Sequence, residues 1–270
     1  MMSTILLLKE LNKGFSYENS LNLKLRNMKI KISKLLLLSI LIFQYAVTTA
    51  QKKNKNRETT QIVLFDGTST DAWKDHKSEN FPEHGWQIKG EILTVLGKTD
   101  TQEGGHDIIT KEQFSNFVLE LEVLLSEGAN SGIKYMVVNT YPGKEGHYLG
   151  LEYQLIDNEK HPDALLGRHG NRKMATLYDI LPARDNIKVN PAGSWNKVKI
   201  VVGKNRVEHW INDKIVIAYN RKSDSYKELV RFSKYKTLEN FGSQKKGHIL
   251  LQGHGNEVSF KNIKITVLKK

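Results

Sequence analysis

Short apolar runs rich in β-branched and aromatic residues recur from residue 62 onward, and Gly, Asn, Asp or Pro separate them. Residues two apart on a strand share a face, and Phe117–Leu125 alternates cleanly, with Glu120 and Glu122 on one face. No long amphipathic helix interrupts the series. The pattern predicts about ten strands, at 86–88, 92–95, 117–125, 132–138, 149–156, 195–202, 206–211, 214–219, 248–252 and 257–267.

One-sided polar alternation is typical of antiparallel sheets that cover a core with one face. Residues 195–202 and 206–211 form a predicted hairpin, and Asn212 and Asp213 turn the chain into the next strand. We therefore predict an all-β sandwich with one domain, residues 61–270. The strand-poor interval 158–190 is expected to wrap one end of it as a long loop, and such loops are usually functional.

The start of the chain has the pattern of a bacterial export signal. After Met28 come three lysines, an apolar stretch at 35–47 and small residues before an expected cut ahead of Gln51. The stretch is shorter than the roughly 20 residues that span a bilayer. We interpret 28–50 as a signal peptide, 51–60 as a polar linker and 1–27 as an over-extended start; the alternative for 1–27 is a helix using Leu6–Leu11.

Charge and cysteine content narrow the class of protein. The formal charge of +12 falls to +7 without residues 1–50, which contain seven Lys and Arg and two Asp and Glu. This surplus is spread along the chain rather than clustered in a stripe with aromatics, which argues against nucleic-acid binding. The chain has no cysteine, hence no disulfide and no site for a lipid anchor. We expect a periplasmic or secreted protein without a stable membrane anchor after signal cleavage.

Three segments place polar side chains at alternate positions of apolar strands: 128–133, 151–157 and 247–256. Glu152 and Gln154 therefore share one face, as do Gln252 and His254, while the Leu and Ile neighbours point to the core. A sheet face lined with Glu, Gln, His and Asn is suited to a polar ligand.

In this order along the chain, several motifs together resemble the 3-keto-disaccharide hydrolase family over 62–267: Leu64-Phe65-Asp66-Gly67, Trp73, Trp86, Gly128–Ile133, Glu152–Asp157, Leu177-Tyr178-Asp179, Gly193–Asn196, Gly247–Gln252 with His254-Gly255, and Phe260–Ile263. The resemblance implies a concanavalin-A-like jelly-roll sandwich with a carbohydrate cleft on its concave sheet, acting on glycosides oxidised to a 3-ketone. Gly253 and Lys261 depart from the pattern, which has Asp and Arg there.

The 3-ketone makes the C2 proton acidic, so a base can remove it and the C1 oxygen can leave by elimination, after which water adds. Such chemistry needs a base, a proton donor and groups facing the enolate oxygen. Glu152 and His254 are the predicted acid/base pair. The alternative is a sugar-binding Glu152 and a His254 bonded only to the backbone.

Further polar residues of the same segments are predicted to bind substrate: Asn130, Ser131, Lys134, Gln154, Asp157, Tyr178 and Gln252. Asn130-Ser131-Gly132 is otherwise simply a turn, Lys134 an ordinary surface lysine, and Tyr178 an edge aromatic. His169 and Arg172 are candidates for a lid over the cleft, or solvated loop charges.

Metal and cofactor binding stay unassigned or are not expected. Histidines and carboxylates at 106–107, 157–161, 169, 248 and 254 form no known ligand signature. Structural calcium occurs in sandwiches of this class, but no Asp-rich loop supports it. We expect no cofactor.

Two functions remain from the sequence. The first is an exported hydrolase or lyase that cleaves 3-keto-glycosides, and the alternative is a non-catalytic carbohydrate-binding sandwich. They differ in whether Glu152 and His254 share a substrate. A third possibility, a protein-interaction domain, has no sequence feature in its favour.

Overall fold

The computed structural model describes residue 44, residues 59–139, residue 141 and residues 147–269. Residues 59–270 form one compact unit, which begins two residues before the boundary predicted at 61. The predictions for the over-extended start, for the signal at 28–50 and for the linker as far as residue 58 lie outside the described residues. Among those described, no helix is both long and apolar enough to cross a membrane.

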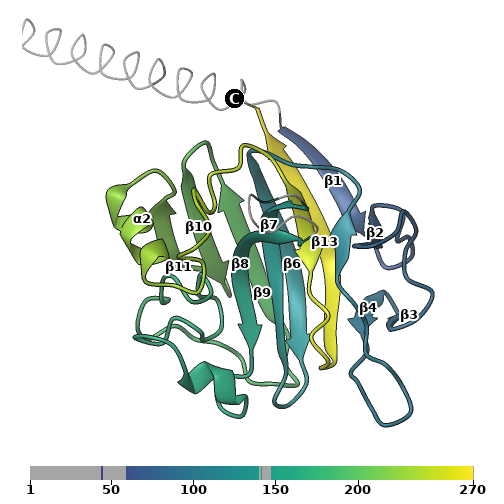
Figure 1. Cartoon of the computed structure of the whole chain (residues 1–270). Helices are drawn as coiled ribbons and strands as arrows, with labels where there is room; N and C mark the ends of the chain where they lie inside the picture. Colours follow the sequence, from purple (N-terminus) through teal and green to yellow (C-terminus); the bar gives the residue numbers. More distant parts are fainter. Residues whose placement is uncertain (1–43, 45–58, 140, 142–146, 270) are drawn as a thin grey trace, which may run out of the picture. The chain divides into compact units, whose positions relative to one another are not determined.

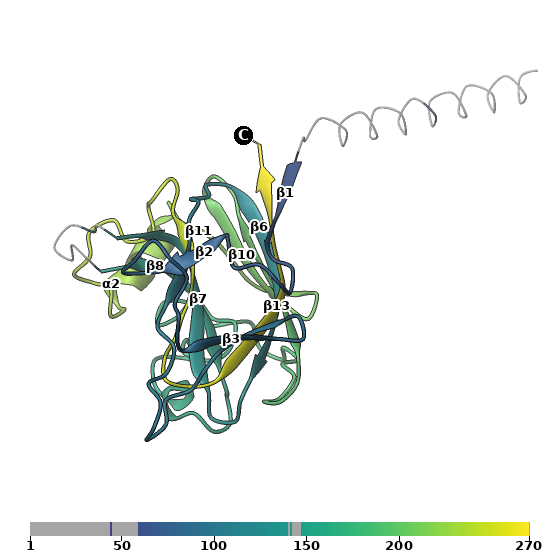
Figure 2. The ribbon, with the colours of Figure 1, turned by 90° about the vertical axis from the view of Figure 1, so that its right-hand side faces the viewer.

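Antiparallel strands form two sheets that pack face to face, as Figures 1 and 2 show. The eight-stranded sheet contains, in spatial order, β11 (Lys214–Asn220), β10 (Arg206–Ile211), β9 (Asn196–Val202), β6 (Phe117–Leu125), β13 (Val258–Leu268), β4 (Ile92–Val95) and β3 (Trp86–Lys89), with β1 (Thr59–Phe65) also pairing with β13. The five-stranded sheet contains β2 (Trp73–Asp75), β5 (Ile108–Thr110), β12 (His248–Leu251), β7 (Asn130–Val138) and β8 (Leu149–Ile156). This arrangement confirms the all-β sandwich.

The core lies between the two sheets. Along β6 the odd-numbered residues from Phe117 to Leu125 are buried and the even-numbered ones are partly exposed, as the alternation predicts. The largest fully buried side chains come from both sheets and include Trp73, Tyr135, Tyr153, Phe117 and Phe260.

Three strands were missed: β1, β2 and β5. β2 and β5 have three residues each, which is too short for an alternation to show. β1 begins at Thr59, inside the predicted linker, and it is held by pairing along β13 rather than by its own burial, since its first five residues are exposed.

One short helix also lay outside the prediction. α2 (Asp224–Arg231) begins at Ser223, whose hydroxyl accepts a hydrogen bond from the Tyr226 N–H at 3.2 Å. Tyr226 is buried, and its ring stacks on Tyr219 with centroids 5.4 Å apart. The helix leads directly into residues 232–241, which reach the outer face of the five-stranded sheet.

The interval 158–190 contains only the 3-10 helix η1 (Pro162–Leu165) and isolated bridges. Its return segment runs beside β8, because backbone hydrogen bonds join Gln154 to Thr176 and Ala175, and Tyr178 to the Glu152 carbonyl. The predicted long loop is therefore present, and it carries Tyr178 to the edge of the five-stranded sheet.

Candidate active site

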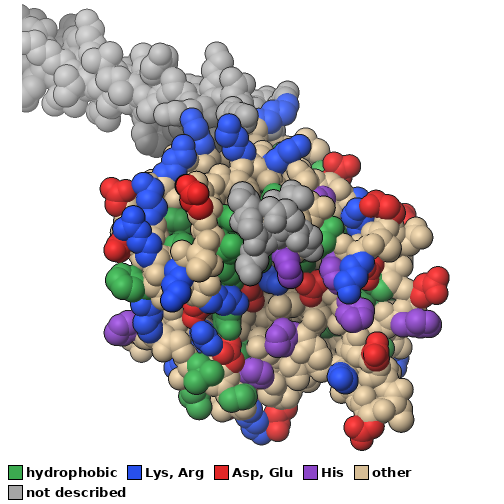
Figure 3. Space-filling model, viewed as in Figure 1, with side chains coloured by type: hydrophobic (Ala, Val, Ile, Leu, Met, Phe, Trp, Pro, Cys, Tyr) green, Lys and Arg blue, Asp and Glu red, His purple; other side chains and the backbone are tan. Residues whose placement is uncertain are grey.

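A cavity of about 170 Å³ lies on the outer face of the five-stranded sheet, away from the core. Figure 3 views this face, on which histidines lie among acidic and basic side chains. Seven of the nine predicted site residues line the cavity: Asn130, Lys134, Glu152, Gln154, Tyr178, Gln252 and His254. The two residues predicted for acid/base chemistry therefore face the same space.

Alternation along β8 explains this placement. Leu151, Tyr153 and Leu155 belong to the core, so the intervening Glu152 and Gln154 point to the cavity. Glu152 is 6% exposed and Gln154 is 1% exposed. Lys134 on β7 pairs in register with Glu152 and so joins the same face.

The Glu152 carboxylate occupies a space that a glycine on the neighbouring strand leaves open. It lies over Gly132, where an added Cβ would meet Glu152 Oε1 at 2.7 Å. The buried Tyr235 lines the cavity together with Glu152. Burial raises the pKa of the Tyr235 hydroxyl well above its ordinary value, and the charge of Glu152 acts in the same direction. The Tyr235 phenol therefore stays protonated in the cavity beside Glu152.

Gln154 holds an acceptor that no protein group uses. Its Nε2 donates to Asn130 Oδ1 at 3.2 Å, while its buried Oε1 has no hydrogen-bond partner among the described residues. A buried polar atom without a partner is costly. Because Gln154 lines the cavity, a hydroxyl of a bound ligand would satisfy this oxygen.

Tyr178 is held from the 158–190 loop. Its hydroxyl donates to Asp163 Oδ2 at 2.8 Å, and Asp163 Oδ1 also receives Arg172 Nη1 at 2.8 Å. Burial, followed by the hydrogen bond to Asp163, raises the pKa of Tyr178 above its ordinary value. The phenol is thus a fixed, neutral wall of the cavity.

Gln252 and His254 enter from the segment after β12. Gln252 donates its backbone N–H to the Gly132 carbonyl at 3.0 Å, which fixes the segment against β7. His254 is exposed at the rim, and among the described residues no hydrogen bond holds its imidazole. Glu152 therefore lies in the depth of the cavity and His254 at its opening.

Two predicted substrate-binding residues lie elsewhere. Ser131 alternates to the other side of β7, is fully buried, and donates its hydroxyl to the Gln252 carbonyl at 2.7 Å. Asp157 accepts backbone N–H groups of Gly128 at 2.8 Å and Glu159 at 3.0 Å, and these bonds lower the pKa of Asp157 against the opposing effect of burial. Both side chains hold backbone in place instead of lining the cavity.

Five residues of the cavity lining were missed by the sequence reasoning, and three of them have polar side chains: Tyr148, Lys234 and Tyr235. Tyr148 directly precedes β8, but Lys234 and Tyr235 follow α2 and carry no strand alternation. Nothing in the local sequence pattern marks Lys234 or Tyr235, because only tertiary packing brings their segment to β8.

Arg172 is a tether and not a lid. It bridges Asp163 and Asp179, with Nε 2.8 Å from Asp179 Oδ1. His169 is exposed and does not line the cavity. Within the described ranges, no group of three or more His, Asp or Glu is arranged to hold a metal ion.

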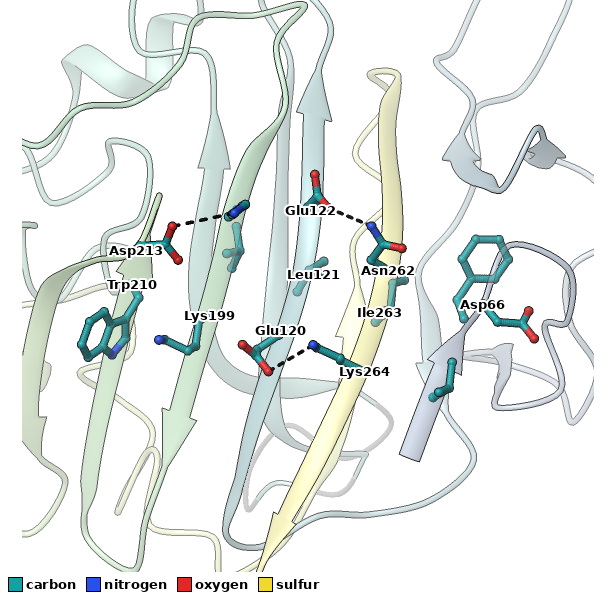
Figure 4. A pocket seen from close by; sticks show the side chains of 14 residues that line it. Asp66, Glu120, Leu121, Glu122, Lys199, Trp210, Asp213, Asn262, Ile263 and Lys264 are labelled. Atoms are coloured by element: carbon teal, nitrogen blue, oxygen red, sulfur yellow. Dashed lines mark hydrogen bonds and ion pairs between the residues drawn. The ribbon is translucent and has the colours of Figure 1, made fainter. Parts of the chain in front are cut away.

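A second cavity, of about 550 Å³, lies on the outer face of the eight-stranded sheet (Figure 4). Most of its charged groups have partners. Glu120 pairs with Lys264 at 3.7 Å and Lys197 with Asp213 at 3.8 Å, while Lys199 lies over the Trp210 ring at 4.0 Å. Glu122 pairs with Lys261 at 3.6 Å. The pairing of these groups is typical of a solvated sheet face, so we place the chemistry in the smaller cavity.

The sequence profile described as the 3-keto-alpha-glucoside-1,2-lyase-like domain matches residues 60–266. The chain belongs to this family. A 3-keto-disaccharide hydrolase of Bacteroides thetaiotaomicron is 36% identical over 228 residues, which cover 77% of this chain and 78% of that protein. The resemblance stated from the sequence motifs is confirmed, and the chain is a hydrolase.

Solved structures agree with this membership of the 3-keto-alpha-glucoside-1,2-lyase-like family. A protein of Parabacteroides distasonis ATCC 8503, described provisionally as a glycosyl hydrolase, is 27% identical with a TM-score of 0.67, covering 77% of this chain and 94% of that one. A second structure from the same strain, 23% identical with a TM-score of 0.58, covers 77% and 100% and shows the same fold. The predicted concanavalin-A-like jelly-roll sandwich is confirmed.

The two departures from the family motifs have different consequences in the structure. An added Cβ at Gly253 would lie 1.9 Å from the Gly105 carbonyl oxygen, so no side chain fits there. The Gly253 N–H donates to Asp107 Oδ1 at 3.0 Å. A carboxylate from another segment of the chain therefore lies beside Gly253, next to His254 in the sequence. Lys261 lies on the other sheet, over the Trp195 ring at 4.1 Å, and does not touch the cavity.

Proposed function

We propose that this protein cleaves 3-keto-disaccharides by elimination followed by hydration, with Glu152 and His254 as the acid/base pair. The observation that carries the proposal is the shared cavity of these two residues. A binding module would need no second titratable group there. The 36% identical 3-keto-disaccharide hydrolase supports the choice of substrate class.

The cavity has the size for one sugar ring. Its volume of about 170 Å³ is below the ~300–1,000 Å³ of pockets that enclose drug-sized ligands. We therefore place the oxidised ring against β7 and β8 and the leaving sugar outside. Gln154 Oε1, Asn130 and Gln252 supply the hydrogen bonds that orient the ring's hydroxyls.

The position of each group supports one role for it in the proposed reaction. Glu152 lies deep in the cavity, where its carboxylate removes the C2 proton, and the electron pair moves into the enolate of the C3 ketone. The C1–oxygen bond then breaks, and the exposed His254 protonates the departing oxygen at the rim. Water adds across the resulting C1–C2 double bond, its hydroxyl at C1 and its proton at C2, to give the free 3-keto sugar.

The reaction neither gains nor loses electrons, so the proposal includes no redox cofactor. The signal predicted at 28–50 supports work in the periplasm or outside the cell. The N-terminal residue of the mature protein, read by mass spectrometry after expression in a Gram-negative host, tests this localisation. An uncleaved chain would contradict it.

The activity is tested by incubating the purified protein with 3-keto-trehalose, beside trehalose, in D₂O and following the products by NMR. We expect glucose release from the keto sugar alone, with deuterium at C2 of the 3-keto product beyond that of an enzyme-free control. Binding of the keto sugar without turnover would identify a carbohydrate-binding module instead.

The acid/base roles are tested by Glu152→Gln and His254→Ala, each expected to lower turnover at least tenfold while the melting temperature stays within a few degrees. The matched control is Glu120→Gln on the opposite sheet, whose partner Lys264 is partly exposed and whose loss should cost little. Full activity in both cavity variants would remove these residues from the mechanism.

A further inference from the structure

Lys234 lies in the cavity beside the proposed base, although no sequence motif marks it. Its segment follows α2, and its side chain lines the cavity with Glu152 and Tyr178. Lys234 Nζ is 4.0 Å from the centroid of the Tyr178 ring. The ammonium group therefore lies over a wall of the cavity, although the residue as a whole is exposed.

Buried and partly buried charges fix the backbone of Lys234 and the Tyr178 ring beneath its ammonium group. The Lys234 backbone N–H donates to Asp179 Oδ2 at 2.6 Å, and Asp179 Oδ1 accepts Arg172 Nε at 2.8 Å. Arg172 also binds Asp163, which receives the hydroxyl of Tyr178. One network thus fixes both the backbone of Lys234 and the ring beneath its ammonium group.

The Lys234 ammonium group lies close enough to Glu152 to feel its charge, but it forms no ion pair with any carboxylate that the structure describes. Among the described residues, none of the ion pairs within 4 Å involves Lys234. Desolvation lowers the pKa of Lys234, and the charge of Glu152 opposes that shift. An ammonium carries three donors, so donors remain for a ligand oxygen.

We propose that the Lys234 ammonium binds the C3 ketone oxygen and stabilises the enolate that forms when Glu152 removes the C2 proton. C2 and C3 are adjacent atoms of the sugar. The base that acts on C2 and the cation that binds the C3 oxygen must therefore share one cavity, as Glu152 and Lys234 do. A preorganised cation facing developing negative charge is the kind of group that accelerates such a step. The inference rests on the proposed function.

Lys134 also lines the cavity, but it is less well fixed. Within the described part of the chain, no hydrogen bond, ion pair or aromatic ring holds its ammonium group, whereas Tyr178 holds that of Lys234. A catalytic cation that must meet one oxygen atom requires a fixed position. We therefore assign the ketone to Lys234.

Steady-state kinetics with 3-keto-trehalose test the assignment in Lys234→Met, Lys234→Arg and the control Lys236→Met, which removes an exposed lysine of the same segment. Removing one donor of this type costs about 10²–10³ in kcat. We expect that loss in Lys234→Met with KM within about threefold, partial recovery in Lys234→Arg, and wild-type rates in the control. The rate of deuterium entry at C2 should fall together with kcat.

A kcat of Lys234→Met within threefold of wild type would overturn the role of Lys234 and leave the proposed function standing. An inactive wild-type protein would instead overturn the proposed function itself. The two failures are therefore distinguishable by the wild-type rate alone.

A lysine beside a ketone can also react covalently: the neutral amine adds to C3, a proton is taken up, water leaves, and an iminium forms. Trapping with cyanoborohydride during turnover, followed by peptide mass spectrometry, separates the two roles. We expect no sugar adduct on Lys234. A reduced adduct at that residue, together with an inactive Lys234→Arg, would overturn the non-covalent role.

Discussion

Single glycine positions determine where the side chains of the cavity lie. Gly132 leaves the space in which the Glu152 carboxylate sits, and Gly253 allows the chain to pass close to Gly105 just before His254. In both places the missing Cβ matters through its neighbour and not through backbone freedom, since neither glycine has a positive φ. Substitution of Gly132 should therefore affect mainly activity, and substitution of Gly253 mainly stability.

Gly132→Ala should affect activity more than stability. The new Cβ would meet Glu152 Oε1 at 2.7 Å, and a carboxylate at the end of a flexible side chain can move away. We expect kcat at least tenfold lower, with the melting temperature within a few degrees of wild type. Kinetics and thermal unfolding measure both, and an unchanged kcat would show that the carboxylate position seen here is not needed.

Gly253→Asp should affect stability. The new Cβ would lie 1.9 Å from the Gly105 oxygen, which belongs to the backbone and cannot move away alone. Overpacking of this kind costs about 1–3 kcal/mol, which lowers the melting temperature by about 2–4 °C per kcal/mol in a domain of this size. At Gly203 the nearest atom is 3.4 Å away, so Gly203→Asp is the control and should melt near wild type. A Gly253→Asp protein as stable as that control would disprove the clash.

At the scale of elements, the cavity depends on two segments that are not strands of the sheet beneath it. The 158–190 loop brings Tyr178, and the segment after α2 brings Lys234 and Tyr235. Asp179 connects them, because its two oxygens accept from Arg172 and from the Lys234 backbone. The loop and the helix therefore position the cavity wall together.

Asp179→Asn tests this connection. Asp179 has a φ of 61°, a conformation that Asn also tolerates, so the substitution changes the charge and one acceptor with little backbone strain. Hydrogen bonds to charged groups contribute roughly 1.5–3 kcal/mol. We expect a lower melting temperature and a lower kcat.

Asp185→Asn is the matched control for Asp179→Asn, because Asp185 is exposed in the same loop. It should match wild type in the melting temperature and in kcat. If Asp179→Asn behaved in the same way as Asp185→Asn, the loop and the segment after α2 would be positioned by other contacts.

At the scale of the whole molecule, the core between the sheets contains a titratable group. His209 of β10 is fully buried. Its Nε2 lies 2.8 Å from Tyr135 Oη, and its Nδ1 lies 3.1 Å from the Ala175 carbonyl oxygen. The carbonyl can only accept, so Nδ1 carries the proton and Nε2 accepts from Tyr135. Burial lowers the pKa of His209 to about 4.

Folding stability should therefore fall with acidification. Between pH 6.5 and about 4 the unfolded His209 binds a proton while the folded one does not, so the free energy of unfolding decreases through this window, by up to about 3 kcal/mol. Urea unfolding at several pH values measures it. His209→Gln keeps a neutral side chain with a donor and an acceptor and should show a smaller loss between those values; an equal loss in both proteins would exclude His209 as the cause.

The sequence by itself determined the sandwich and most of the cavity's floor, because both follow from period-two alternation. The polar positions of β8 and the segment after β12 were assigned to one face from their spacing alone, and Glu152, Gln154, Gln252 and His254 all line the cavity. The longer strands β6 and β8 showed the pattern, whereas β2 and β5 were too short to show it.

Only the tertiary structure decided which polar residues already had partners and which distant segments closed the cavity. Ser131 and Asp157 lie within the right motifs, but each is bonded to backbone that the sequence does not reveal as its neighbour. Lys234 and Tyr235 lie near Glu152 although more than eighty residues separate them in the sequence. Asp107 and Gly253 are separated by even more residues, yet they share a hydrogen bond. Such contacts depend on how loops return over a sheet, and local alternation carries no information about that path.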